Sequence, residues 1–152
     1  MNTLLDSYVY RVDVEWTGRR AGRVEADGLP DLAVSAPPEF LGDAGIWTPE
    51  HLLVAATASC LMATFLGVAE LHKLSVASYE SRAFARLEKI PGEGYRFTEI
   101  TLAPEIGVAS EDLEKAEKVL ARAARNCFIS NSLRAEVRIE PHFVAARAAL
   151  SR

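Results

Sequence analysis

Residues 48–71 read TPEHLLVAATASCLMATFLGVAEL, and this segment decides how the rest of the chain folds. Thr48 supplies an N-cap hydroxyl, Pro49 suits the first helical position, and Glu50 lies in the first turn, where the helix dipole stabilises a carboxylate. These residues predict a helix that begins there and ends at about Leu71. Because the helix has no polar face, we expect protein to surround it on nearly all sides.

The same segment is apolar enough to be compared with a membrane span. Residues 52–69 contain no charged side chain and come close to the length that a span requires. However, small and hydroxyl residues are frequent in it, and Glu50 and Glu70 flank it without the Lys/Arg asymmetry of a spanning helix. We therefore predict a helix buried inside a domain and no association with a membrane.

The composition is that of one ordinary globular domain. The chain has 152 residues, of which 49% are hydrophobic and 25% charged, enough to build a core without disulfide bonds, so we expect a single domain over residues 1–152. The net charge of -4 argues against nucleic acid as a partner, because counterion release needs a basic surface. Charged residues interrupt the first 16 positions, unlike in a secretory signal, so we expect a cytoplasmic location.

Strand patterns surround the helix on both sides. Apolar residues at positions 8, 10, 12, 14 and 16 alternate with others and predict a strand with five apolar side chains on one face. The remaining predicted strands are residues 23–26, 32–35, 75–87, 94–102 and 135–140. A second helix is expected from Ser110, with an apolar stripe that ends at Cys127. This grouping indicates an α+β domain in which antiparallel sheets pack on two helices, and not a βαβ repeat.

The chain has two cysteines, Cys60 in the apolar helix and Cys127 at the end of the second one. A cysteine within an apolar helix is most often an inert small hydrophobe. A reactive one needs a lowered pKa, which comes from a helix N-terminus, a metal or a cation. Cys60 lies about 15 Å from the start of its helix, so the dipole has little effect on it. A cation must therefore come from elsewhere, and the turn GRRAGR at residues 18–23 holds the clustered candidates.

No pattern predicts a metal site. The two cysteines have neither the CxxC nor the zinc-finger spacing, so their pairing is a question for the tertiary structure. His51, His72 and His142 show no metal-binding spacing either.

Two cysteine segments resemble one known family. TPEHLLVAATASC at residues 48–60, followed by LMATF, closely resembles the central-helix signature of the OsmC/Ohr peroxidases. NCFISNSL at residues 126–133 resembles the resolving-cysteine segment of that family, although Phe128 stands where the family often has proline. WTGRRAGRVEADG at residues 16–28 and the order of the elements agree as well, so the resemblance covers nearly the whole chain.

The resemblance implies an OsmC-like fold, an intertwined homodimer and specific roles. Cys60 would be the peroxidatic cysteine, Cys127 the resolving one, and Glu50 the carboxylate that anchors a catalytic arginine. Counting back from the glycine at position 22 favours Arg20 as that arginine, whereas counting from the aspartate at position 27 favours Arg19. We take Arg20 as the prediction.

The chemistry implied by the resemblance is reduction of organic hydroperoxides. A Cys60 thiolate attacks the peroxide and becomes a sulfenic acid, Cys127 forms a disulfide with it, and an external dithiol reductant of lipoyl type reopens the bond; no bound cofactor is expected. Four apolar residues are the predicted substrate pocket and favour organic peroxides over hydrogen peroxide: Leu61, Phe65, Phe40 and Trp47.

Helix geometry adds a constraint of its own. Glu50 and Cys60 are ten residues apart, so a straight helix separates them by about 15 Å along its axis and about 80° around it. Either the helix breaks after Glu50, or the Glu50 and arginine pair reaches the cysteine of a second subunit. Together with the apolar helix, this favours an obligate homodimer.

Two other functions remain open at this point. The chain could be an OsmC-like redox sensor or hydrophobic ligand-binding protein whose Cys60 does not turn over, because function depends on the site and not on the fold. It could also be a structural dimer module with two inert thiols, in which case the Cys60 pKa would stay at or above about 8.5.

Overall fold

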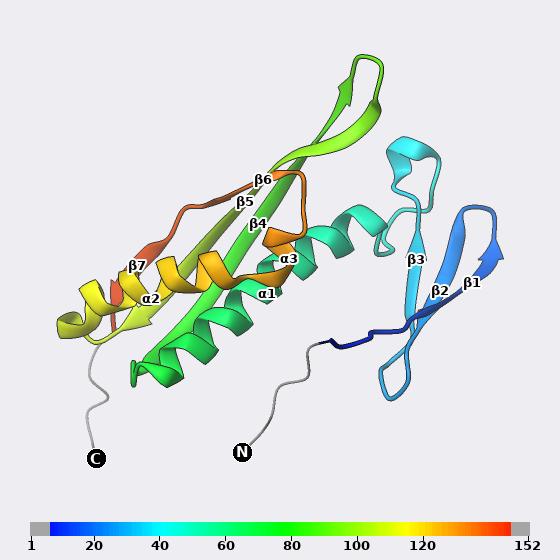
Figure 1. The fold of residues 1–152 in the computed structure, drawn as a ribbon. Helices are drawn as coiled ribbons and strands as arrows, with labels where there is room; N and C mark the ends of the chain where they lie inside the picture. The colour runs from blue at the N-terminus through cyan, green and yellow to red at the C-terminus, as the bar shows by residue number, and fades with distance from the viewer. Residues whose placement is uncertain (1–6, 147–152) are drawn as a thin grey trace. The chain divides into compact units, whose positions relative to one another are not determined.

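The chain folds into two compact units, one ending at Leu52 and the other beginning at Leu53. This computed structural model describes residues 7–146 (Figure 1). Strands and helices are grouped along the chain rather than regularly alternating, so the predicted α+β class is confirmed.

The first unit contains an antiparallel meander, as the sequence predicts. Its strands are β1 (Asp13–Gly18), β2 (Ala21–Glu25) and β3 (Leu32–Ser35), paired in that order. A short 3-10 helix, η1 (Pro38–Phe40), follows within the loop that leads to the next helix.

The start of β1 differs from the prediction. The strand was expected from residue 8 but begins at Asp13, because its partner β2 ends opposite that residue, at Glu25. Among residues 7–146, no strand pairing includes residues 8–12. The alternating apolar side chains of β1 are also uncovered, with Val14 68% and Trp16 75% exposed. The first unit thus presents an apolar edge strand.

The loop after β3 depends on a glycine. Leu41 has a φ of 63°, and the amide of Gly42 donates a hydrogen bond to the carbonyl oxygen of Pro37 at 3.1 Å, which closes a tight turn. A Cβ atom on Gly42 would lie 1.5 Å from the carbonyl oxygen of Ala36. Only a residue without a side chain fits at this position.

Helix α1 (Pro49–Leu71) has the bounds that the sequence predicts. The N-cap is confirmed, since the amide of His51 donates to Thr48 Oγ1 at 3.2 Å. The helix is long and apolar enough to pass the length and composition test for a membrane span, but one face is packed inside the protein. That face consists of Thr57, Leu61, Phe65 and Ala69.

The rest of α1 is not enclosed by this chain. Met62 is 38% and Leu66 40% exposed, and Ser59, Ala63 and Gly67 on the same side are exposed as well. The expectation that protein surrounds the helix on nearly all sides is therefore wrong for the single chain, because the one sheet beside it can cover only one face.

The second unit is built on a long hairpin of β4 (Val76–Ile90) and β5 (Gly94–Val108), both longer than predicted. After β5 come the 3-10 helix η2 (Ser110–Asp112), α2 (Leu113–Asn126) and the short helix α3 (Phe128–Asn131). The chain ends in β6 (Glu136–Ile139) and β7 (His142–Ala145), the second of which was not predicted.

The direction of the last two strands corrects the prediction of purely antiparallel sheets. Both β6 and β7 pair with β5 in parallel. The cause is α2, which crosses over between β5 and β6 and returns the chain to the beginning of β5, so that the next strand enters in the same direction. Figure 1 shows this crossover helix beside the sheet.

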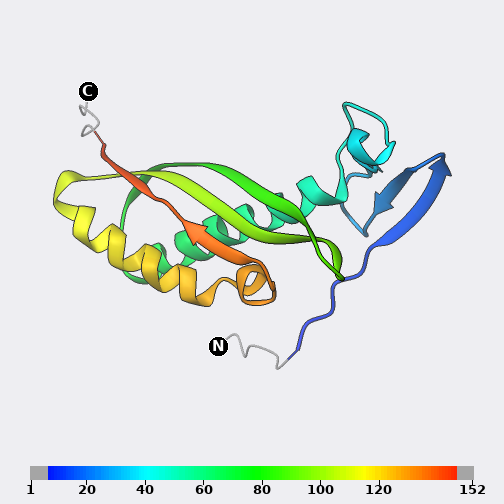
Figure 2. The ribbon, with the colours of Figure 1, turned by 90° about the horizontal axis from the view of Figure 1, so that it is seen from above.

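One hydrophobic core joins the hairpin to both helices. The buried side chains of β5, including Ile100, Leu102 and Ile106, pack in one cluster with Leu61 and Phe65 of α1. From α2 the same cluster receives Ala116, Val119, Leu120 and Ala123, followed by Cys127. Both helices run along the hairpin (Figure 2).

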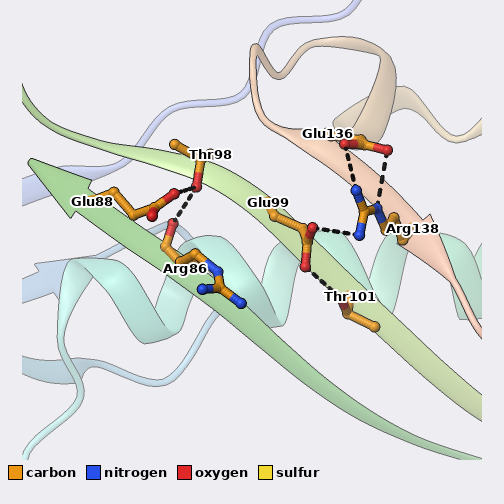
Figure 3. Close-up of polar contacts among 7 residues, drawn as sticks. All are labelled: Arg86, Glu88, Thr98, Glu99, Thr101, Glu136 and Arg138. Atoms are coloured by element: carbon orange, nitrogen blue, oxygen red, sulfur yellow. Dashed lines mark hydrogen bonds and ion pairs between the residues drawn. The ribbon is translucent and has the colours of Figure 1, made fainter. Parts of the chain in front are cut away.

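The sheet also carries a polar network (Figure 3). The Arg138 guanidinium contacts Glu99 at 2.8 Å and Glu136 at 3.0 Å, and Thr98 donates a hydrogen bond to Glu88. Exposed ion pairs of this kind contribute only about 0–1 kcal/mol each. These ion pairs therefore contribute little to the stability of the sheet.

We expect Gly42→Ala to destabilise the protein by roughly 2–3 kcal/mol, because the new methyl group overlaps backbone atoms that cannot move aside. Urea unfolding followed by circular dichroism measures the change. Ala44→Ser, an exposed position in the same loop, is the matched control and should change stability by less than about 0.5 kcal/mol. Equal stability of the two variants would show that the turn is not constrained.

Candidate functional site

The chain changes direction sharply after α2, and the residues of this bend contribute to the candidate site. Cys127 leaves the helix in an extended conformation, with φ -71° and ψ 111°, and α3 begins at the next residue. Asn131 Nδ2 donates to the carbonyl oxygen of Arg125 at 3.0 Å, and Ser132 Oγ to that of Phe128 at 2.8 Å. The bend that the sequence predicts at residues 126–133 is thus a fixed turn, which we call the α3 turn (residues 127–132).

This turn brings the two cysteines together. Both are free thiols; Cys127 is fully buried and Cys60 is half-buried. The Cys127 side chain hydrogen-bonds to the sulfur of Cys60. The pairing that sequence spacing left open is therefore geometrically available within one chain.

The environment of Cys60 favours its thiolate. Burial by itself raises the pKa of Cys60, but hydrogen bonds outweigh it and the pKa is lowered overall. The donors, in order of effect, are the backbone of Ile129, the Cys127 thiol, the Thr64 hydroxyl and the backbone of Phe128. A thiolate is the nucleophilic form of cysteine, so this sulfur is prepared for attack.

The environment of Cys127 does the opposite. Burial raises the pKa of Cys127, and the nearby Cys60 sulfur raises it further, against hydrogen bonds from Ser130 that lower it. Ser130 Oγ lies 3.2 Å from Cys127 Sγ. The two sulfurs thus differ, with the proton favoured on Cys127 and the negative charge on Cys60.

Tyr79 is a further polar group next to these sulfurs. Its ring packs against Phe65 with centroids 5.7 Å apart, and its hydroxyl is buried without a hydrogen-bond partner among residues 7–146. Burial, with the charge of Cys127, raises the pKa of Tyr79 to about 12. Tyr79 is therefore neutral at physiological pH and adds no charge to the site.

The source of the Cys60 activation is one that the sequence analysis missed. We predicted that a cation must lower the pKa, because the start of α1 is too far away. In the structure, neutral donors of the α3 turn, together with the Thr64 hydroxyl of α1, lower it. The sequence held one signal for this: Phe128 replaces a proline that would have no backbone N–H to donate.

The structure places the predicted arginine and carboxylate in the first unit but does not pair them. Arg20 Nη1 donates to the carbonyl oxygen of Phe40, and Arg19 lies 3.6 Å from Asp43. No ion pair joins either arginine to Glu50 within the part of the chain that the structure describes. Glu50 Oε2 is buried and has no hydrogen-bond partner there.

One of the two geometric alternatives for Glu50 is excluded. Helix α1 is continuous over its 23 residues, so it does not break between Glu50 and Cys60. A buried carboxylate oxygen without a donor costs free energy.

The four predicted pocket residues lie in different environments. Leu61 and Phe65 are fully buried core residues, and Phe40 is half-buried in the first unit. Trp47 lines an open cavity of about 280 Å³ together with Gly45, Ile46 and His51. Leu61 and Phe65 belong to the core cluster of the second unit, whereas Phe40 and Trp47 belong to the first unit. As for metals, residues 7–146 contain no group of three potential ligands.

Comparisons with known proteins point to one family. A family profile described as OsmC-like protein matches residues 42–142. A solved OsmC-like protein of unknown function from Vibrio cholerae is 30% identical, with a TM-score of 0.80 over 89% of this chain and 99% of that one. A search of curated proteins gave no match.

Two further solved structures share the fold. An organic hydroperoxide resistance protein from Legionella pneumophila is 27% identical, with a TM-score of 0.68 over 90% of this chain and 98% of that one. Another from Elizabethkingia anophelis is 23% identical, with a TM-score of 0.73 over 96% and 100% of the two chains.

Removal of one donor should weaken the Cys60 thiolate. We expect Thr64→Val to raise the Cys60 pKa and to slow its alkylation by iodoacetamide at pH 7 roughly fivefold, the effect of one hydrogen bond of about 1 kcal/mol. Rates are measured in the Cys127→Ser background, against pH, so that only one thiol reacts. Thr57→Val is the control, because Thr57 donates to the carbonyl oxygen of Leu53 and not to sulfur. An unchanged pH profile for Thr64→Val would contradict the assignment.

Proposed function

Because the chain belongs to the OsmC-like protein family, we propose that it is a thiol-dependent peroxidase that reduces organic hydroperoxides to alcohols. The observation that carries the proposal is the pair of unlike thiols: Cys60, with a lowered pKa, hydrogen-bonded to Cys127, with a raised one. An inert pair of core cysteines has no reason to be surrounded by hydrogen-bond donors. The likeness to two organic hydroperoxide resistance proteins supports the choice of substrate.

In the first step, the Cys60 thiolate attacks the distal oxygen of the hydroperoxide. The O–O bond breaks, the sulfur gains that oxygen as a sulfenic acid, and the alkoxide takes up a proton and leaves as the alcohol. The donors of the α3 turn hold the sulfur as a thiolate before the attack.

In the second step, Cys127 attacks the oxidised sulfur of Cys60. An S–S bond forms, the S–O bond breaks, and the oxygen leaves as water. An external dithiol, of lipoyl type by family resemblance, then reopens the disulfide by thiol exchange. We place this cycle in the cytoplasm, where reducing systems keep thiols open between turnovers.

Apolar surface at the mouth of the site supports an organic substrate. The Phe128 side chain is 78% exposed although its backbone contacts the Cys60 sulfur. Such a side chain can contact the alkyl group of a substrate, and hydrogen peroxide has no such group. We therefore infer a preference for alkyl or lipid hydroperoxides.

The proposal is tested by peroxide consumption with cumene hydroperoxide and hydrogen peroxide in the presence of dihydrolipoamide. With this reductant we expect faster turnover of cumene hydroperoxide than of hydrogen peroxide, and at least a 100-fold loss in Cys60→Ser. Without reductant, we expect Cys127→Ser to consume a single equivalent of peroxide and to stop at the Cys60 sulfenic acid. If the wild type also reacts only once, the protein is a redox sensor. If no variant reacts at all, it is a ligand-binding or structural protein.

We further propose that the working form is a homodimer. The exposed side of α1, formed by Ser59, Met62, Ala63, Leu66 and Gly67, is apolar or small, and β1 is an apolar edge strand. Both features are typical of surfaces that a second chain covers. In that dimer Arg20 pairs with the orphaned oxygen of Glu50, and the pair approaches the partner's Cys60.

Mixed dimers test this arrangement directly. Arg20→Met and Cys60→Ser are each expected to be nearly inactive alone, but a heterodimer of the two contains one site with an intact arginine and an intact cysteine. We expect about half of the wild-type activity per heterodimer, purified with two affinity tags after co-expression. No recovery would mean that the arginine acts within its own chain or that the protein is a monomer, which sedimentation distinguishes. The same experiment with Arg19→Met decides between the two arginines.

A further inference from the structure

Ser130 is the residue of the site to which neither the proposed cycle nor the family resemblance assigns a role. Its hydroxyl donates a hydrogen bond to Cys127 Sγ at 3.2 Å. The contact follows from the local fold, because the extended conformation of Cys127 and the single turn of α3 bring the side chain at position 130 back over the sulfur. The amide of Asn131 closes the turn on the carbonyl oxygen of Cys127 at 3.0 Å, so Ser130 is held in place.

We propose that Ser130 is a positioning residue for the resolving step, holding Cys127 and stabilising its thiolate once Cys60 has been oxidised. The proposal rests on the proposed function, since it concerns the formation of the Cys60 to Cys127 disulfide. The donors of the α3 turn then act on different sulfurs. The backbone of Phe128 and Ile129 hydrogen-bonds to Cys60, and Ser130 hydrogen-bonds to Cys127.

The order of events follows from the charges around Cys127. In the reduced protein, burial and the neighbouring Cys60 sulfur raise the pKa of Cys127, whereas the hydroxyl and backbone of Ser130 lower it. Oxidation converts the Cys60 thiolate into a neutral sulfenic acid and so removes the opposing charge. The Ser130 hydrogen bonds remain. Cys127 therefore becomes easier to ionise only after its target has formed.

Among the described residues that face Cys127, no charged group other than Cys60 affects the pKa of Cys127. Tyr79 is the second titratable neighbour, and its raised pKa of about 12 keeps it neutral. The donors that act on Cys127 are the hydroxyl and the backbone of Ser130. Loss of the hydroxyl leaves a buried sulfur with one donor fewer, which disfavours its thiolate.

The step is balanced without any further reactant. The Cys127 thiol gives up its proton, its sulfur forms the S–S bond with Cys60, and the S–O bond of the sulfenic acid breaks. The departing hydroxide and the released proton form water. Cys60 sulfur is reduced and Cys127 sulfur is oxidised by the same electron pair.

Single-turnover trapping tests the proposal. The reduced protein is mixed with one equivalent of cumene hydroperoxide without reductant, quenched with dimedone at increasing times, and analysed by mass spectrometry for the Cys60 adduct and for the disulfide. In Ser130→Ala we expect peroxide to be consumed at the wild-type rate, whereas the disulfide forms roughly fivefold more slowly and the trapped sulfenic acid increases. Ser130→Thr keeps the hydroxyl and should restore the rate.

Ser132→Ala is the matched control, because Ser132 belongs to the same turn but donates to the carbonyl oxygen of Phe128. It should form the disulfide at the wild-type rate. If disulfide formation slows equally in Ser130→Ala and Ser132→Ala, the effect comes from a less stable turn, and the proposal is overturned. A wild-type rate in Ser130→Ala would also overturn it.

A second measurement does not depend on peroxidase activity. In Cys60→Ser, which lacks the Cys60 thiolate, the ultraviolet absorbance of the Cys127 thiolate is followed against pH, because no reagent then has to reach the buried sulfur. We expect Ser130→Ala in this background to move the midpoint to higher pH and Ser130→Thr to return it; an unmoved midpoint overturns the inference. If wild-type Cys60 forms no sulfenic acid but this midpoint moves, the proposed function fails while the hydrogen-bond role of Ser130 stands.

Discussion

The packing of Leu61 and Phe65 against β5 is the constraint on which the site depends. Both side chains are fully buried and lie one helical turn apart, so they fix the rotation of α1 about its axis. Cys60 and Thr64 each precede one of them in sequence. The same rotation therefore turns these two side chains away from the sheet and toward the chain that leaves α2, where the α3 turn supplies its donors.

Neutral hydrogen-bond donors lower the pKa of Cys60, although its sulfur lies in a half-buried position. Burial opposes the thiolate, and several hydrogen bonds together outweigh it. Hydrogen bonds to a charged acceptor are stronger where water is partly excluded, so the same burial that costs free energy also makes each donor more effective. The extended conformation of Cys127 is essential here, because it ends α2 and lets the next backbone N–H groups point toward sulfur instead of continuing the helix.

The homodimer that we propose would give the apolar surfaces of the two units a common explanation. The exposed side of α1 is apolar or small, Val14 and Trp16 of β1 are exposed, and Glu50 Oε2 has no donor among residues 7–146. Folding of a single chain neither buries these apolar side chains nor supplies a donor to this oxygen from the described residues. A second copy would bury the apolar area and supply new polar neighbours, which is why the homodimer and the arginine assignment belong to one proposal.

Local sequence patterns predicted those features of the fold that depend on residues close together in the chain. The bounds of α1 follow from the Thr48 cap and an uninterrupted apolar run, and the meander follows from its turns. What required contact between distant residues could not be predicted. The parallel pairing of β6 and β7 depends on the path of α2, and β1 begins at Asp13 because β2 ends opposite it. Only the tertiary structure identified the donors to Cys60, because residues 60 and 129 become neighbours when both helices pack in one core with the hairpin, and no local pattern encodes that approach.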